Sequence, residues 1–241
     1  MTLRTKIGVL MAEFLGTAIL TSTVLAESNT NGGIFINKVW FIAATAGITI
    51  SLLTLVIGRI SGAHVNPAVT IGLWTLRKIE TTTAVVYVAA QLLGAAVALR
   101  LYQFMQADVL QNVASRFEWR IFVAEAVGTV IFTFGVAAAV TQKLSGYKAA
   151  FTIGASFMLG VLVAATASNG FLNPAVALGN NSWSWTYATA PIIGSVLGMN
   201  IYDLFLAPES SFKSPLLVSK EVTTSSAKTT IKKRTAKKTK N

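Results

Sequence analysis

The chain has 241 residues, of which 53% are hydrophobic and only 12% are charged, and its mean hydropathy is +0.61. A soluble domain usually carries about 25% charged residues, so this composition excludes an ordinary soluble protein and indicates a membrane protein. The sequence contains no cysteine, which excludes disulfides, thiolate metal sites and thiol nucleophiles.

Six apolar segments are long enough to cross a bilayer, which takes about 20 helical residues. They lie near 8–27, 39–58, 82–102, 120–140, 149–167 and 184–206. The first segment is not predicted to be a secretory signal, because five further spans follow it and Glu13 interrupts its apolar run. We therefore predict an all-α integral membrane protein with six transmembrane helices.

The distribution of basic residues predicts the orientation of these spans. An even number of spans places both termini on the same side of the membrane. That side carries Arg4, Lys6, Arg59, Arg77, Lys78, Lys143 and Lys148, whereas the other side carries Lys38, Arg100, Arg116 and Arg120. The positive-inside rule then predicts a plasma or inner membrane protein in which residues 1–7 and the C-terminus are cytoplasmic.

The C-terminal segment, residues 207–241, differs in composition from the rest of the chain. The formal net charge is +11, and nine of the twenty Lys and Arg lie between Lys213 and Lys240. The segment is rich in Ser, Thr and Lys without apolar periodicity, which predicts a disordered cytoplasmic tail. Its expected role is orientation and solubility, and contact with anionic lipid is the alternative. Beside a membrane domain, we do not expect it to bind nucleic acid.

Two motifs recur in the same order along the chain. The first pair is Ala12–Thr17 (AEFLGT) and Ala124–Thr129 (AEAVGT), and the second pair is Asn66-Pro67-Ala68 and Asn173-Pro174-Ala175. The pairs are separated by 112 and 107 residues, so the chain contains a repeat of about 8–103 and 120–206. Each half has three spans, and an odd number makes the second half enter from the opposite face. The sequence therefore predicts an inverted repeat.

Each Asn-Pro-Ala triplet opens a short apolar stretch between the second and third spans of its half. The stretch from Pro67 to Leu76 gives about 15 Å of helix, half of a hydrocarbon layer of about 30 Å. Asn is a favoured N-cap, and Pro is tolerated at the first helical position. Two such re-entrant half-helices would meet by their N-termini at mid-membrane. The centre would be electropositive, with two Asn amides free to donate hydrogen bonds.

These motifs resemble those of the aquaporins, the major intrinsic protein family. The segment Gly58–Thr70 (GRISGAHVNPAVT) is closely similar to the first pore loop of that family, and the resemblance covers residues 8–206. It implies an aquaporin-like fold of six spans and two half-helices, assembled as a homotetramer with one pore in each subunit. It also implies passive passage of water or small neutral solutes, and no cofactor.

The resemblance assigns supporting roles to several polar residues. In the family, glutamates at the positions of Glu13 and Glu125 support the pore loops by accepting backbone N–H bonds, and Gln91 has a similar role. His64, the only histidine, also lies at a family position in the first loop, and pH gating is its alternative role. A charge within a span is costly without partners, so we expect the glutamates to be held by such bonds.

The selectivity filter of the family has four positions, which in this chain are Ala46, Val161, Gly170 and Val176. The fourth is almost always Arg in the family, where it donates hydrogen bonds to the solute and repels cations. All four residues here are small or aliphatic, so we expect a wider, apolar constriction. Ala177 and Ala188 match neither the glycerol-passing nor the water-passing subgroup.

The sequence therefore predicts a passive channel for water or for small neutral solutes such as ammonia, urea, boric acid or glycerol. An ion-coupled secondary transporter also uses inverted repeats and broken helices, but it should carry unpaired acids near its substrate. A non-conducting adhesion or scaffold protein, with Val176 in a hydrophobic plug, is the other alternative. An enzyme is not expected, because the sequence offers no nucleophile–base pair, metal-ligand cluster or phosphate loop.

Overall fold

A computed structural model describes residues 2–29, 38–107, 109–110 and 116–207. The chain divides into two units, Met1–Leu206 and Ala207–Asn241, and the predicted disorder of the tail lies outside the described residues. The described part of the first unit contains helices and no strand. The helices are α1 (Leu3–Asn29), α2 (Lys38–Ser61), α3 (Pro67–Thr75), α4 (Thr81–Gln106), α5 (Trp119–Thr141), α6 (Tyr147–Ala164), α7 (Pro174–Gly179) and α8 (Trp185–Phe205).

Six of these helices are long, and each matches one predicted span. Within the described residues, α1, α2, α4, α5 and α6 are long and apolar enough to cross a membrane. Helix α8 has 21 residues but falls outside that set, because polar residues such as Asn200 and Asp203 dilute its apolar run. The predicted fifth span ends too late, since α6 stops at Ala164 and the next residues turn towards Glu125.

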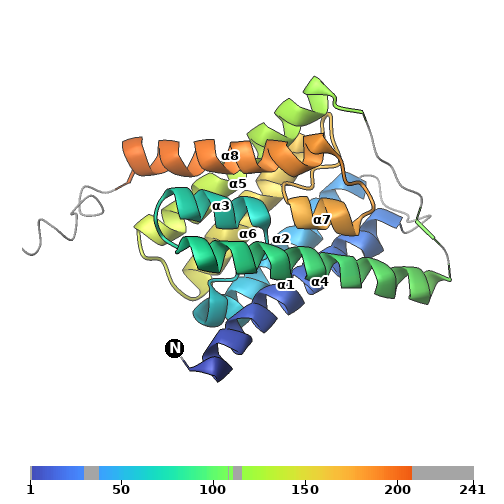
Figure 1. The fold of residues 1–241 in the computed structure, drawn as a ribbon. Helices are drawn as coiled ribbons and strands as arrows, with labels where there is room; N and C mark the ends of the chain where they lie inside the picture. Colours follow the sequence, from blue (N-terminus) through green and yellow to red (C-terminus); the bar gives the residue numbers. More distant parts are fainter. Residues whose placement is uncertain (1, 30–37, 108, 111–115, 208–241) are drawn as a thin grey trace, which may run out of the picture. The chain divides into compact units, whose positions relative to one another are not determined.

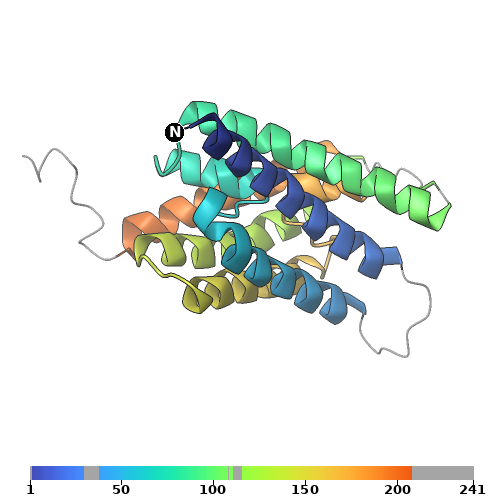
Figure 2. The same cartoon turned by 90° about the horizontal axis from the view of Figure 1, so that it is seen from below.

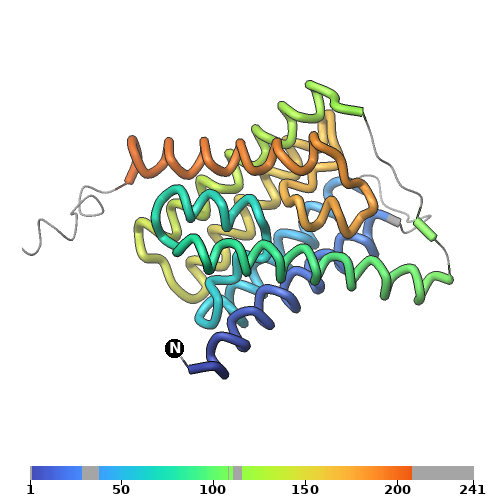
Figure 3. The backbone as a smooth tube through the Cα atoms, viewed as in Figure 1, coloured from blue at the N-terminus to red at the C-terminus, as the bar shows by residue number. Residues whose placement is uncertain are grey.

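The helices form two halves that each contain one short helix. In the first half α1 packs against α2 and α4, and in the second half α5 packs against α6 and α8. The halves meet where α2 lies against α6 (Figure 2). The short helices α3 and α7 approach each other end to end, with α4 on one side and α8 on the other (Figures 1 and 3). This arrangement places the start of both short helices in the middle of the bundle.

Glycines allow the long helices to approach closely. A Cβ atom on Gly47 of α2 would lie 2.8 Å from the carbonyl oxygen of Gly154 of α6. A Cβ atom on Gly128 of α5 would lie 2.6 Å from the carbonyl oxygen of Gly160 of α6. No side chain fits at such positions, and small residues at helix contacts are the usual means of packing within a membrane.

Substitution of Gly194 by Ala tests this packing at the contact between α8 and α5. The new Cβ atom would overlap the carbonyl oxygen of Ala126 and lie 2.9 Å from Cβ of Thr129. We expect Gly194→Ala to lower the stability of the detergent-solubilised protein by about 1–3 kcal/mol, the usual cost of overpacking. The measurement is the midpoint of thermal unfolding.

Gly8→Ala is the matched control, because a Cβ atom on Gly8 of α1 meets no atom within 4 Å. This variant should unfold at the temperature of the unchanged protein or slightly above it, since Ala favours helix over Gly. Equal midpoints for Gly194→Ala and Gly8→Ala would contradict the close contact of α8 with α5.

Candidate functional site

The loop between α2 and α3 is bonded to a buried carboxylate. Oε1 of Glu13 accepts hydrogen bonds from Oγ of Ser61 at 2.6 Å and from the backbone N–H of His64 at 3.0 Å. Its Oε2 accepts from the backbone N–H of Val65 and from Nε2 of Gln91, both at 2.7 Å. The side chain of Glu13 is fully buried, and these four donors occupy both of its oxygens.

The loop between α6 and α7 is bonded to Glu125 in the same way. Oε1 of Glu125 accepts from Oγ of Ser168 at 2.8 Å and from the backbone N–H of Phe171 at 3.0 Å. Its Oε2 accepts from the backbone N–H of Leu172 at 2.7 Å. The loop residues lie 107 positions after their counterparts in the first loop, so the repeat extends to these bonds.

The bonds to the two carboxylates hold an unfavourable backbone conformation. Val65 has a φ of +43° and Leu172 has a φ of +52°, in the left-handed region. A residue other than glycine seldom adopts this region, and a β-branched residue such as Val65 does so least readily. Such a conformation persists only where the surroundings enforce it. In both loops the enforcing bond comes from the glutamate on the first helix of the same half.

Each Asn-Pro-Ala triplet starts a short helix. Oδ1 of Asn66 accepts a hydrogen bond from the backbone N–H of Ala68 at 2.8 Å, and Oδ1 of Asn173 accepts from that of Ala175 at 3.0 Å. A proline occupies the first position of both helices. Helix α3 has nine residues and α7 has six, so both are too short to cross a bilayer.

The two asparagines also join the loops to each other. Nδ2 of Asn66 donates to the carbonyl oxygen of Leu172, and Nδ2 of Asn173 donates to the carbonyl oxygen of Val65, both at 2.9 Å. The prediction of two free amides was therefore wrong in part. One N–H of each amide is bonded to the opposite loop, and one N–H of each remains to donate elsewhere.

His64 lies among polar and aromatic neighbours in the first loop. Its Nδ1 is 3.1 Å from Oγ1 of Thr70, and its ring packs edge-on against Tyr87 with 5.2 Å between the ring centroids. Gln91 donates to the same Thr70 hydroxyl at 3.0 Å. His64 and Gln91 thus belong to one hydrogen-bonded group on the α3 side of the asparagine pair.

Three of the four predicted filter positions are buried apolar residues, and the fourth lies next to one of them. Ala46 of α2, Val161 of α6 and Val176 of α7 belong to the same buried apolar cluster. Gly170 has a φ of +65°, and a Cβ atom there would lie 3.2 Å from Cγ1 of Val161. Gly170 and Val161 are therefore in contact. None of the four residues carries a charge or a polar side chain.

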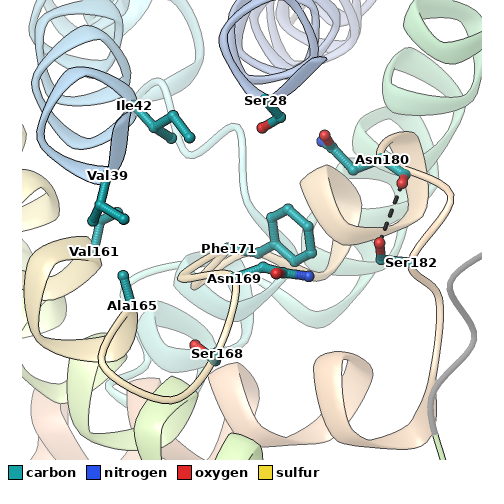
Figure 4. Close-up of a pocket in the computed structure, with 10 residues that line it drawn as sticks. All are labelled: Ser28, Val39, Ile42, Val161, Ala165, Ser168, Asn169, Phe171, Asn180 and Ser182. Atoms are coloured by element: carbon teal, nitrogen blue, oxygen red, sulfur yellow. Dashed lines mark hydrogen bonds between the residues drawn. The ribbon is translucent and has the colours of Figure 1, made fainter. Parts of the chain in front are cut away.

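A cavity of about 380 Å³ opens beside Val161, on the α7 side of the asparagine pair (Figure 4). Its polar lining consists of Ser28, Ser168, Asn169, Asn180 and Ser182, and its apolar lining consists of Val39, Ile42, Val161, Ala165 and Phe171. Phe171 was not predicted as a site residue, because the family resemblance points only to the four filter positions. The separation of 107 residues between the two triplets also separates His64 from Phe171, and this equivalence was the signal that could have found Phe171.

The centre of the bundle therefore contains the asparagine N–H donors and buried apolar side chains, with a cavity beside Val161. Among the described residues, no three His, Cys, Asp or Glu side chains lie close enough to hold a metal ion. Two inverted halves, with short helices that meet at paired asparagines, define an α-helical membrane protein of the channel class. The comparisons with known proteins agree with this class.

The model of the family described as "Major intrinsic protein" matches residues 2–202. The chain is 32% identical over 212 residues to aquaporin NIP6-1 of Arabidopsis thaliana, covering 82% of this chain and 68% of that protein. It is 36% identical over 180 residues to aquaporin-1 of Rattus norvegicus, covering 68% of this chain and 67% of that protein. The chain therefore belongs to the major intrinsic protein family, and it is an integral membrane channel for water and small solutes, not an enzyme.

A solved structure agrees with the fold. The X-ray structure of the aquaglyceroporin from Plasmodium falciparum superimposes with a TM-score of 0.68 at 24% sequence identity, covering 83% of this chain and 96% of that one. The predicted aquaporin-like fold is confirmed.

Replacement of Glu125 by Gln tests its role in holding the second loop. The new NH₂ group would face either the N–H of Phe171 or that of Leu172, leaving a buried donor without an acceptor. We expect Glu125→Gln to destabilise the protein by about 1–3 kcal/mol and to reduce its flux. The measurements are thermal unfolding in detergent and permeability in proteoliposomes.

Glu118→Gln is the matched control, because Glu118 precedes α5 and its side chain makes no capping bond. It should change neither the unfolding midpoint nor the flux. Full stability and full flux in Glu125→Gln would show that the carboxylate does not hold the loop.

Proposed function

We propose that this channel passes small neutral solutes, with or without water, through a constriction formed by Ala46, Val161, Gly170 and Val176. One observation carries the proposal: Val176, 1% exposed, occupies the position after the second triplet and contributes only methyl groups. A guanidinium group there would present five N–H donors and a charge, whereas Val presents neither. The constriction therefore favours solutes that carry no net charge.

The apolar constriction also determines how water competes with other solutes. A water molecule in a narrow apolar ring loses hydrogen bonds, at a cost of about 1–3 kcal/mol for each unsatisfied group. A small organic solute loses less, because part of its surface is apolar. A ring wide enough for such a solute also lets water keep some of its neighbours. These costs support a channel of low selectivity among small neutral molecules.

Asn66 and Asn173 supply hydrogen-bond donors at the centre of the proposed pore. Asn66 and Asn173 each keep one N–H that is not bonded to the opposite loop. A carbonyl or hydroxyl oxygen of a passing solute can accept from both. The N-termini of α3 and α7 add partial positive charge at the same point, which opposes the entry of cations.

We further propose that both termini are cytoplasmic and that the protein is a homotetramer whose basic tail contacts anionic lipid. The turns and adjoining helix ends on one side of the bundle carry basic residues, which supports a cytoplasmic assignment for that side: Arg59, Arg77, Lys78, Lys143 and Lys148. Helices α1 and α2 expose apolar side chains that suit lipid or a neighbouring subunit: Leu15, Ile19, Ile48 and Leu52. The cavity beside Val161 then lies on the outer side.

Stopped-flow measurements on proteoliposomes test the proposed function. We expect the reconstituted protein to pass urea and glycerol at rates that rise linearly with concentration and do not saturate. Water flux with no uptake of any solute would reject the broad neutral-solute channel. Saturable, ion-dependent uptake would favour the transporter, and no flux of any kind would favour the scaffold.

Substitution of Val176 by Arg tests the assignment of the constriction. The longer, charged side chain would narrow the proposed constriction and supply N–H donors for water. We expect the ratio of glycerol to water permeability in Val176→Arg to fall by roughly tenfold or more. Both permeabilities are measured by stopped-flow light scattering.

Val176→Leu is the control that separates volume from charge. Leu adds volume without donors, so it should reduce glycerol flux without raising water flux relative to the unchanged protein. An unchanged ratio in Val176→Arg would show that the constriction lies elsewhere.

A further inference from the structure

The two pore loops each carry one ring at equivalent positions of the repeat. His64 and Phe171 are 107 residues apart, as are Asn66 and Asn173. The ring of Phe171 packs edge-on against Tyr187, with centroids 5.0 Å apart and an interplanar angle of 63°. The ring of His64 packs on its own tyrosine with nearly the same geometry, at 5.2 Å and 69°. The repeat thus places an aromatic side chain on each side of the asparagine pair.

The backbone of the second loop determines where Phe171 points. Glu125 accepts the N–H groups of both Phe171 and Leu172. The side chain of Leu172 is fully buried and fills the gap between Gly128 and Gly160, where added Cβ atoms would lie 2.8 and 2.9 Å from its methyl groups. Because Leu172 occupies the contact between α5 and α6, Phe171 is directed the other way.

The ring of Phe171 is held in place by its neighbours. Tyr187 is 3% exposed, and its hydroxyl accepts the backbone N–H of Asn169 at 3.2 Å. The backbone N–H of Gly170 is bonded to Oγ of Ser168 at 3.0 Å. Phe171 itself is 6% exposed. A ring on so constrained a backbone, packed against an anchored tyrosine, is a fixed wall of the cavity.

That wall lies in the same cavity as Val161, one of the proposed constriction residues. Figure 4 shows the ring of Phe171 among the residues that line the cavity, with Ile42 towards one side and Asn180 towards the other. Val161 lines the same cavity and contacts Gly170, the residue before Phe171. A solute in the cavity therefore lies beside both the ring of Phe171 and Val161.

We propose that Phe171 is the size-determining residue on the α7 side of the pore, a role that rests on the proposed neutral-solute channel and refines it. The ring limits the cross-section of a solute and offers it no hydrogen bond. Ser28 and Asn180 also line the cavity, where Nδ2 of Asn180 donates to the carbonyl oxygen of Val176, so the Ser28 hydroxyl and Oδ1 of Asn180 give a solute polar contacts while the ring restricts its width (Figure 4). Urea-sized solutes should pass more readily than longer or branched polyols.

Phe171 would narrow a region for which the sequence predicts a wide, apolar constriction. The four family positions are all small or aliphatic, and taken alone they indicate a wide opening. Phe171 returns an aromatic ring to the same region from a different position in the loop. The channel would then select neutral solutes by their width, without the charge that Val176 does not provide.

Variants at Phe171 test this role by the ratio of glycerol to urea permeability in proteoliposomes. Phe171→Ala should raise the ratio by roughly tenfold, the scale on which an apolar pocket distinguishes a methylene group. Phe171→Trp should lower it. Phe151→Ala is the matched control, because Phe151 of α6 is 74% exposed and does not line the cavity, and its ratio should equal that of the unchanged protein.

These measurements separate failure of the Phe171 role from failure of the proposed neutral-solute channel. A raised ratio in a Phe171→Ala protein that keeps the unfolding midpoint of the unchanged protein supports the proposal. An unchanged ratio in a Phe171→Ala protein that still passes urea would overturn it. If the unchanged protein passes no solute but Phe171→Ala does, Phe171 closes the path, and both the neutral-solute channel and the size selection that rests on it fail. If neither protein passes a solute, both proposals fail.

Discussion

The bonds from Glu13 and Glu125 to the backbone of the two loops are the interactions on which the rest of the site depends. In a bilayer, non-helical backbone is tolerated only where its N–H and C=O groups find partners within the protein. A carboxylate suits this task because its two oxygens accept several donors, and bonds to a charged acceptor are the stronger ones. Four donors reach Glu13 and three reach Glu125, so the buried charges are compensated within the protein. Each glutamate thereby fixes the asparagine that follows its loop.

Because of the repeat, both halves hold their loop by a buried glutamate. The residues around the two loops differ, so the two ends of the pore are unlike. On the α3 side, His64, Thr70 and Gln91 form a polar group. On the α7 side, Phe171 takes the place of His64, and Glu125 has no counterpart of the bond from Gln91. A solute that crosses the asparagine pair therefore moves between a polar group and a cavity of mixed polar and apolar lining. The glutamate bonds place equivalent loop residues at equivalent positions, and the identity of those residues, such as His64 or Phe171, determines what a solute contacts.

Much of this could be predicted from the sequence, because local rules govern it. Asparagine capping, proline at the first helical position and the length of apolar runs depend on neighbours in the chain, and they located both short helices and six long ones. The direction of Phe171 could not be predicted, because it depends on Leu172 filling a gap between two glycines of different helices. The bonds from Asn66 and Asn173 to the opposite loop were missed for the same reason. They join residues more than 100 positions apart.

Because Val176 carries no charge, other features of the pore must exclude ions. An ion that enters an apolar ring must lose its hydration shell, and transfer of an unpaired charge into such surroundings is very costly. That cost applies only if the ring is too narrow for the hydrated ion. Under the proposal made above, Phe171 supplies this narrowness beside Val161, and the partial charges at the starts of α3 and α7 add a barrier to cations at the centre. Size selection and ion exclusion would then share one physical origin, the width of the path past a single fixed ring.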